Sequence, residues 1–90
     1  MESEERKKLL EDVKSEVVLL TDNTFHVRYY SDMSGTHIEV SIEDTDDVAK
    51  SISNKFSNRK DIRRLIVRKC PTGYIEEFLG TVKNKGVINE

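Results

Sequence analysis

The sequence predicts a single small α+β domain covering residues 1–90, in which an antiparallel sheet packs against helices. Residues 25–30 and 36–43 alternate apolar and polar side chains, the period of a half-buried strand. Residues 44–58 then change to the spacing of an amphipathic helix. The chain has 90 residues, which suit one domain with one modest core and leave no room for a second domain, and its composition is 36% apolar and 36% charged. We expect the element order α-β-β-β-α-β-α.

The N-terminal segment carries apolar residues on one helical face, namely Leu9, Leu10 and Val13. Residues 16–20 admit two interpretations. A continuing helix would extend the apolar stripe through Val17, to pack on the sheet or on a second copy in a homodimer. A strand would suit the β-branched neighbours Val17 and Val18 and the turn-forming residues 21–24. We favour the strand.

The two alternating segments predict a β-hairpin with a defined register, because antiparallel partners share a face. Matching apolar to apolar residues pairs Phe25 with Ile42, Val27 with Val40 and Tyr29 with Ile38. This leaves residues 32–35 as a four-residue loop, in which Gly35 is expected to adopt positive φ.

The same register predicts a polar outer face on the hairpin. It gathers His26, Arg28, Tyr30 and His37, which could bind a phosphate or a carboxylate. The alternative is a solvated face on which Arg28 and Glu39 form a cross-strand ion pair.

The central helix is expected to begin at Asp44 or Thr45, either of which can cap its first amide groups. Its buried stripe is Val48, Ile52 and Phe56, with Ala49 beside it. Capping explains the acidic residues at its start. A calcium loop would need a central glycine and a glutamate at the twelfth position, and residues 44–55 have neither.

After the helix, residues 62–69 read as a strand whose apolar centre, 65–67, is expected to be covered on both faces for part of its length. Cys70-Pro71 ends it. Residues 73–85 are interpreted as a last helix that stops at Gly86, with a break at Gly80 as the alternative.

The residues needed for catalysis or for a cofactor are not gathered in any motif. One cysteine and two separated histidines are too few for a zinc site, and sequence alone cannot bring Cys70 to a histidine for nucleophilic catalysis. There is no phosphate-binding or dinucleotide-binding fingerprint. We therefore expect a protein that is not an enzyme and has no metal or cofactor. The absence of a long apolar run and of a signal-peptide pattern favours a cytoplasmic protein with no membrane partner.

Charge is distributed unevenly, although the net charge is only −2. Acidic residues dominate 32–47, and basic residues gather in the segment 59–69: Arg59, Lys60, Arg63, Arg64, Arg68 and Lys69. The order of helix, three strands and helix resembles double-stranded-RNA-binding domains, but residues 44–47 are acidic where those domains are basic. The resemblance therefore assigns no family.

Two functions follow as hypotheses. The first is a small non-enzymatic regulator or inhibitor that binds another protein through a charged surface or a sheet edge. The alternative is an RNA- or DNA-binding domain that uses the basic segment 59–69. The expected partner-binding residues are the six cations of this segment together with His26, Arg28, Tyr30 and His37.

Overall fold

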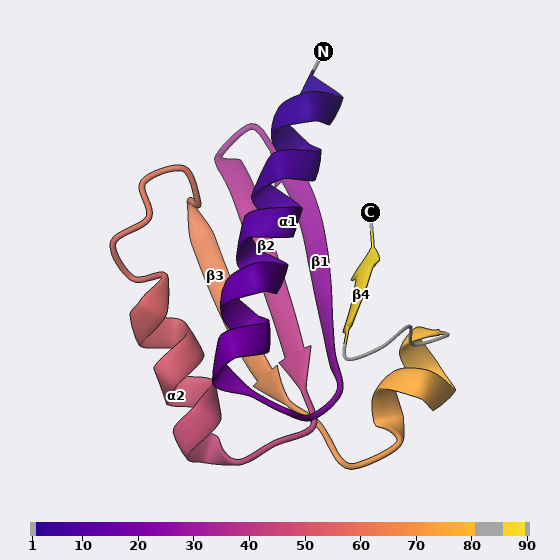
Figure 1. The fold of residues 1–90 in the computed structure, drawn as a ribbon. Coiled ribbons are helices and arrows are strands. Elements are labelled where there is room, and N and C mark those ends of the chain that lie inside the picture. Colours follow the sequence, from indigo (N-terminus) through magenta and orange to yellow (C-terminus); the bar gives the residue numbers. More distant parts are fainter. Residues whose placement is uncertain (1, 81–85, 90) are drawn as a thin grey trace.

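The computed structural model describes residues 2–80 and 86–89, and it has the predicted α+β class. Two helices, α1 (Glu2–Leu20) and α2 (Asp46–Lys55), cover one face of a four-stranded sheet (Figure 1). The strands are β1 (Phe25–Asp32), β2 (Gly35–Ile42), β3 (Arg64–Lys69) and β4 (Gly86–Asn89). A five-residue π-helical segment, η1 (Ile75–Leu79), follows β3. We call the helix-covered side of the sheet its inner face and the opposite side its outer face.

The sheet is mixed, with strand order β3-β2-β1-β4. β1 and β2 are antiparallel, whereas β3 runs parallel to β2 and β4 runs parallel to β1. The expectation of an antiparallel sheet is therefore wrong beyond the hairpin. The physical reason is that α2 carries the chain back along the sheet between β2 and β3, as a helical crossover between parallel strands does.

The predicted hairpin register is confirmed at every pair, including Tyr29 with Ile38 and Tyr30 with His37. The turn is shorter than the predicted 32–35 loop, because Asp32 pairs with Gly35 and only two residues remain between the strands. The Asp32 carboxylate accepts hydrogen bonds from the backbone and side chain of Ser34 at 2.8 and 2.6 Å. Gly35 has φ +129°, the positive value expected for it.

Residues 16–20 are helical, so the strand favoured for them is wrong. Val13 and Val17 are fully buried, whereas Leu19 is 77% exposed. A strand would have turned Val17 and Leu19 to the same side. Packing of the helical stripe on the sheet outweighs the weak strand preference of Val17 and Val18. The observed order is α-β-β-α-β-π-β.

The core lies between the helices and the inner face. It is built from Leu9, Leu10, Val13, Val17, Phe25, Val27, Ile38, Val40, Ile42, Ile52, Phe56 and Ile62. The predicted α2 stripe is confirmed, since Ile52 and Phe56 are buried and Val48 packs against them. Thr45 is the N-cap, and its side chain accepts a hydrogen bond from the Val48 N–H at 3.4 Å. On β3, Leu65 and Val67 pack on the core and Ile66 is half-buried on the other side.

The predicted helix over 73–85 is present only as η1. The chain leaves the helical conformation at Gly80, where φ is +116°, so the alternative of a break there is confirmed. Residues 81–85 lie outside the described part of the chain. Gly86 begins β4 and does not stop a helix, because residues 86–89 pair with β1. The Ile75 N–H at the start of η1 donates to the Glu43 carboxylate at 2.8 Å.

Candidate functional site

The parallel pairing of β3 with β2 joins two surfaces that the sequence presents separately. On β2, the neighbours of His37, Glu39 and Ser41 across this pairing are Arg64, Ile66 and Arg68. The hairpin register brings the outer residues of β1 to the same three positions. The outer face therefore has three cross-strand rows: Tyr30, His37 and Arg64; Arg28, Glu39 and Ile66; His26, Ser41 and Arg68. Six of the ten predicted partner-binding residues belong to it.

The other four predicted residues lie elsewhere. Arg59 donates two hydrogen bonds to Asp61, at 2.8 and 2.6 Å, which hold the pKa of that carboxyl below its usual range. Lys69 turns to the start of α2, where its Nζ is 3.5 Å from an Asp46 oxygen. Lys60 precedes β3 in an exposed turn. Arg63 lines a shallow pocket together with Ser53 of α2 and Phe56 at the end of that helix.

The predicted basic segment is therefore only half compensated within the chain. Arg59, Arg68 and Lys69 each have a carboxylate partner. Lys60, Arg63 and Arg64 are exposed and form no ion pair with the residues that the structure describes.

Glu39 lies at the centre of the outer face between two arginines. One carboxylate oxygen is 2.8 Å from Arg68 Nη2, and the other is 3.9 Å from Arg28 Nη1. The predicted pairing of Arg28 with Glu39 is thus confirmed, and Arg68 joins it. The Glu39 side chain is 15% exposed, whereas those of Arg28 and Arg68 are 56% and 57% exposed. The carboxylate is enclosed while the guanidinium groups keep access to solvent.

Tyr30 is the aromatic centre of the first row. Its ring stacks on that of His37, with centroids 5.2 Å apart and an interplanar angle of 19°. The Arg28 guanidinium carbon lies 5.4 Å from the centroid of the same ring, within the range of a cation–π contact. Tyr30 remains 39% exposed, so its ring is held in position and is still accessible to a partner.

His37, Ser34 and Asp32 form a cluster at the hairpin turn that does not have the geometry of a catalytic triad. Both Ser34 Oγ and Asp32 Oδ1 approach the same ring nitrogen, His37 Nε2, at 3.0 and 3.1 Å. A triad needs the hydroxyl and the carboxylate on opposite nitrogens, so that the imidazole can take the hydroxyl proton while the carboxylate orients it. The hydrogen bonds, first those from Ser34, lower the pKa of Asp32 to about 2. The cluster stabilises the turn.

His26 is buried in the third row, where it adjoins a pocket of about 160 Å³ between the sheet and η1. The pocket is lined by His26, Arg28, Glu39, Ser41, Arg68, Tyr74 and Leu79. Burial lowers the pKa of His26, and the nearby Glu39 partly opposes this effect. A lowered pKa favours the neutral imidazole at pH 7. Its Nε2 atom is buried and has no hydrogen-bond partner among the described residues.

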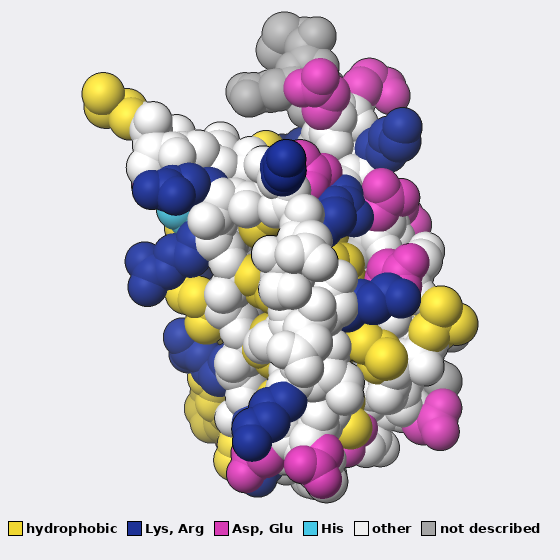
Figure 2. All heavy atoms as spheres, turned by 90° about the vertical axis from the view of Figure 1, so that its left-hand side faces the viewer, with side chains coloured by type: hydrophobic (Ala, Val, Ile, Leu, Met, Phe, Trp, Pro, Cys, Tyr) yellow, Lys and Arg dark blue, Asp and Glu magenta, His cyan; other side chains and the backbone are white. Residues whose placement is uncertain are grey.

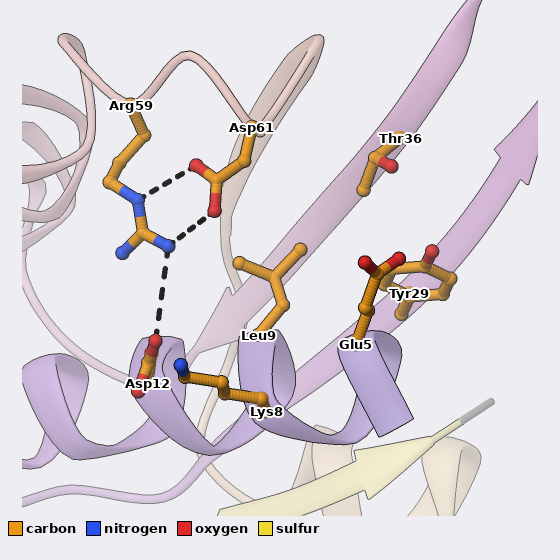
Figure 3. Close-up of a pocket in the computed structure, with 8 residues that line it drawn as sticks. All are labelled: Glu5, Lys8, Leu9, Asp12, Tyr29, Thr36, Arg59 and Asp61. Carbon is orange, nitrogen blue, oxygen red and sulfur yellow. Dashed lines mark hydrogen bonds and ion pairs between the residues drawn. The ribbon is translucent and has the colours of Figure 1, made fainter. Parts of the chain in front are cut away.

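A larger pocket of about 480 Å³ lies between α1, the hairpin and the loop after α2 (Figure 3). Arg59, one of its two cations, points at Asp61 and toward Asp12, whose oxygen is 4.0 Å from Arg59 Nη2 (Figure 3). Glu5 and Lys8 add one further charge of each sign to the lining. The guanidinium is already occupied by carboxylates of the same chain, so this pocket is a weaker candidate for an anionic ligand.

Cys70 is buried, and burial raises the pKa of its thiol. A protonated buried thiol is a poor nucleophile. Among the side chains that the structure describes, no three or more His, Cys, Asp or Glu groups lie together as metal ligands would.

Sequence reasoning missed Ile66, Tyr74 and Leu79 as members of this site. One signal could have found Ile66. A strand, a helix and a second strand in succession, as over residues 36–69, are typical of a parallel pair, and that pairing aligns β3 with the polar side of β2. The contribution of η1 has no comparable signal, since it depends on how the backbone folds back after Pro71.

Comparisons of the sequence with protein-family models, with curated protein sequences and with solved structures found no match. No helix in the described residues has both the length and the apolar character needed to cross a bilayer.

Proposed function

We propose that this protein is a small non-enzymatic binding protein that regulates or inhibits another protein by binding an acidic region of it on the outer face. The observation that carries the proposal is the set of three arginines on this face, Arg28, Arg64 and Arg68, beside the accessible ring of Tyr30. Arginine and tyrosine are among the residue types enriched at the energetic centres of protein interfaces. We further propose a cytoplasmic location, where a free thiol such as Cys70 stays reduced.

Charge complementarity favours an acidic partner. Glu39 and Glu43 are engaged within the protein, by arginines and by the Ile75 N–H respectively. Arg64 forms no ion pair with described residues, and Arg28 only a loose one at 3.9 Å. Figure 2, which views the molecule from the side of β3 and α2, shows Lys and Arg side chains along the margin opposite the helices, whereas Asp and Glu side chains are mixed with Lys and Arg along the helix margin. An acidic partner would be steered to the first margin in preference to the second.

Apolar groups around the arginines supply the other part of an interface. Ile66 is half-buried on the outer face, and Phe78 of η1 is 64% exposed. Phe78 is held by Tyr74, whose ring centroid is 5.0 Å away. Burying such groups against a partner gives affinity that ion pairs between exposed groups do not.

The outer face is better suited to bind a partner than the edge of the sheet. β3 forms one edge of the sheet and carries Arg64, Arg68 and Lys69 within six residues. Charged side chains on an edge strand commonly prevent another strand from pairing with it.

A charge-reversal pair at neighbouring positions tests the proposal. Arg64 lies on the outer face, whereas Arg63 does not, and both are exposed cations without an ion pair among the described residues. Tagged wild-type, Arg64→Glu and Arg63→Glu proteins are used to capture partners from the native cell after nuclease treatment. We expect a stoichiometric protein that Arg64→Glu loses and Arg63→Glu retains. Equal capture by both variants would contradict binding through the outer face.

Nucleic-acid binding is the second candidate, and the Arg28 contact with the accessible Tyr30 ring favours it. An exposed aromatic ring beside arginines can stack on a base of a single strand. Against it, half of the basic segment is paired within the protein, and the net charge is −2. Titration of a labelled single-stranded oligonucleotide at several salt concentrations separates the two. Nucleic-acid binding predicts a steep fall in affinity with salt and a slope that decreases by about one unit in Arg64→Gln; absence of binding at low salt removes this candidate.

A further inference from the structure

The pocket between the outer face and η1 brings buried polar groups of this face together with two of its cations. His26 and Ser41 form its floor, and both are buried. Arg28 and Arg68 line it together with Glu39, which bridges them. η1 contributes Leu79, and Tyr74 precedes this segment in the lining.

The charges around the pocket leave room for one negative charge. Two guanidinium groups and one carboxylate sum to +1, and the neutral His26 adds nothing. A group of charge −1 would bring the cluster to neutrality, whereas a phosphate monoester, which carries about −1.5 to −2 at pH 7, would overshoot it. Carboxylates are also the usual partners of arginine in planar hydrogen bonding.

Hydrogen-bond donors remain for such a group. A guanidinium has five N–H groups, and Arg68 uses one of them for Glu39 in its hydrogen bonds with the described residues. Arg28 is 3.9 Å from Glu39, beyond hydrogen-bonding distance. Among the described residues, the buried His26 Nε2 atom has no hydrogen-bond partner. A buried polar atom without a partner lowers stability unless a ligand or water forms a hydrogen bond with it.

The size of the pocket limits what can occupy it. A volume of about 160 Å³ is well below the roughly 300 Å³ at which pockets for drug-sized ligands begin. A nucleotide does not fit, but the end of an amino-acid side chain does. Leu79 and the Tyr74 ring offer apolar contact to the carbon atoms behind a carboxylate.

We infer that this pocket binds a single carboxylate group, with Arg28 and Arg68 as its charged partners and η1 as the wall against its aliphatic part. The inference rests on the proposed function, because the carboxylate is taken to belong to the acidic partner. Either an aspartate or glutamate side chain or the C-terminus of the partner could supply this group.

Proton and carbon NMR signals of the histidine rings provide the test, since the protein has only two histidines. His26 adjoins the pocket, and His37 lies in the first row of the same face as an internal reference. The folded wild-type protein is titrated with N-acetylglutamate α-amide, with its neutral isostere N-acetylglutamine amide, with N-acetylleucine and with inorganic phosphate. We expect saturable shifts at His26 with the first probe, much smaller ones at His37, and none with the isostere.

The probes distinguish the sources of the carboxylate. Tighter binding of N-acetylglutamate α-amide supports a side chain, and tighter binding of N-acetylleucine supports a C-terminus. Tighter binding of phosphate than of either carboxylate would overturn the inference. So would equal shifts at the two histidines, or shifts with the neutral isostere.

Neighbouring residues of β3 provide matched variants. Arg68→Gln is expected to weaken binding of the preferred carboxylate at least tenfold, whereas Lys69→Gln, which removes the same charge on the inner side, leaves it within twofold. Equal weakening in both variants would mean nonspecific charge attraction and would overturn the inference. If no probe binds while Arg64→Glu still abolishes partner capture, the pocket inference fails and the proposed function stands. Carboxylate binding in a protein whose partner capture is insensitive to Arg64→Glu would support the pocket inference and contradict the proposed function.

Discussion

Arg68 on β3 donates a 2.8 Å hydrogen bond to Glu39 on β2, across 29 positions of sequence. The contact joins β3 to the hairpin across the outer face, where the backbone pairing of β3 with β2 sets the register. Arg28 approaches the other oxygen of the same carboxylate, so Glu39 spaces two guanidinium groups on one surface. The carboxylate therefore both organises the arginines and reduces the positive charge of the outer face.

Replacing Glu39 with glutamine separates these two effects. Glu39→Gln is expected to change the free energy of unfolding by less than about 1 kcal/mol, because both arginines can be solvated where they are more than half exposed. It should bind the acidic partner a few times more tightly, since one charge at about 4 Å is worth about 1 kcal/mol in water. Urea unfolding and partner affinity measure the two quantities. Weaker binding would show that Glu39 matters more for orienting the arginines than for their charge.

Substitutions at Val17 and Leu19 test whether residues 16–20 pack as a helix. Val17→Ala removes two methyl groups from a fully buried position and is expected to lower the free energy of unfolding by about 2–3 kcal/mol. Leu19→Ala, at an exposed position of the same helix, should stay within about 0.5 kcal/mol. Chemical denaturation of both variants measures the difference. Similar losses at both positions would indicate that they share a buried face, as in a strand.

The hairpin could be predicted from sequence because its information is local. Alternation fixes which residues face the core, and one face-to-face match fixes every pair from Phe25 with Ile42 to Tyr30 with His37. The last turns of α1 could not be predicted the same way. The β-branched pair Val17-Val18 favours a strand by a small amount, and the burial of Val17 against the sheet, which decides the outcome, is a tertiary effect.

The site was predictable in its parts and not in its assembly. The alternation of β3 indicates that Arg64 and Arg68 share a side, and that of the hairpin indicates the same for Arg28 and Tyr30. The parallel pairing of β3 with β2 decides that the arginine side of β3 and the polar side of the hairpin form one surface. The same pairing adds Ile66 to that surface. The compensation of Arg59 by Asp61 depends on the conformation of a loop, for which sequence gives no periodic signal.

The N-cap of α2 gives a further prediction. Thr45→Ala removes the side-chain oxygen that accepts from the Val48 N–H and is expected to lower the free energy of unfolding by about 1 kcal/mol. Ser51→Ala, on the exposed side of the same helix, is the control and should stay within about 0.5 kcal/mol. Thermal or urea unfolding checks both. An equal loss at the two positions would mean that helix propensity, and not capping, is being measured.

The hairpin turn makes an acid-sensitive contribution to stability through Asp32. The side-chain and backbone hydrogen bonds from Ser34, followed by the one from His37, lower the pKa of Asp32 from 3.8 to about 2. The folded state therefore binds this proton more weakly than the unfolded state. The resulting stabilisation is fully present above pH 3.8 and is lost as the pH falls from 3.8 to about 2.

The pKa of Asp44 is also lowered, first by the hydrogen bond from the Thr21 hydroxyl and then by that from the Thr45 N–H. Removing one hydroxyl at a time therefore tests the cause of each lowered pKa, with the other carboxyl as the control. Ser34→Ala should raise the pKa of Asp32 toward its ordinary value and leave that of Asp44 unchanged, whereas Thr21→Val should do the reverse. Carboxyl-carbon NMR titration of each variant measures both groups. The Asp32 pKa should rise only part of the way, since the Ser34 N–H still donates to the carboxylate. A pKa of Asp32 that does not respond to Ser34→Ala would show that the Ser34 N–H and His37, without the Ser34 hydroxyl, account for the lowered pKa.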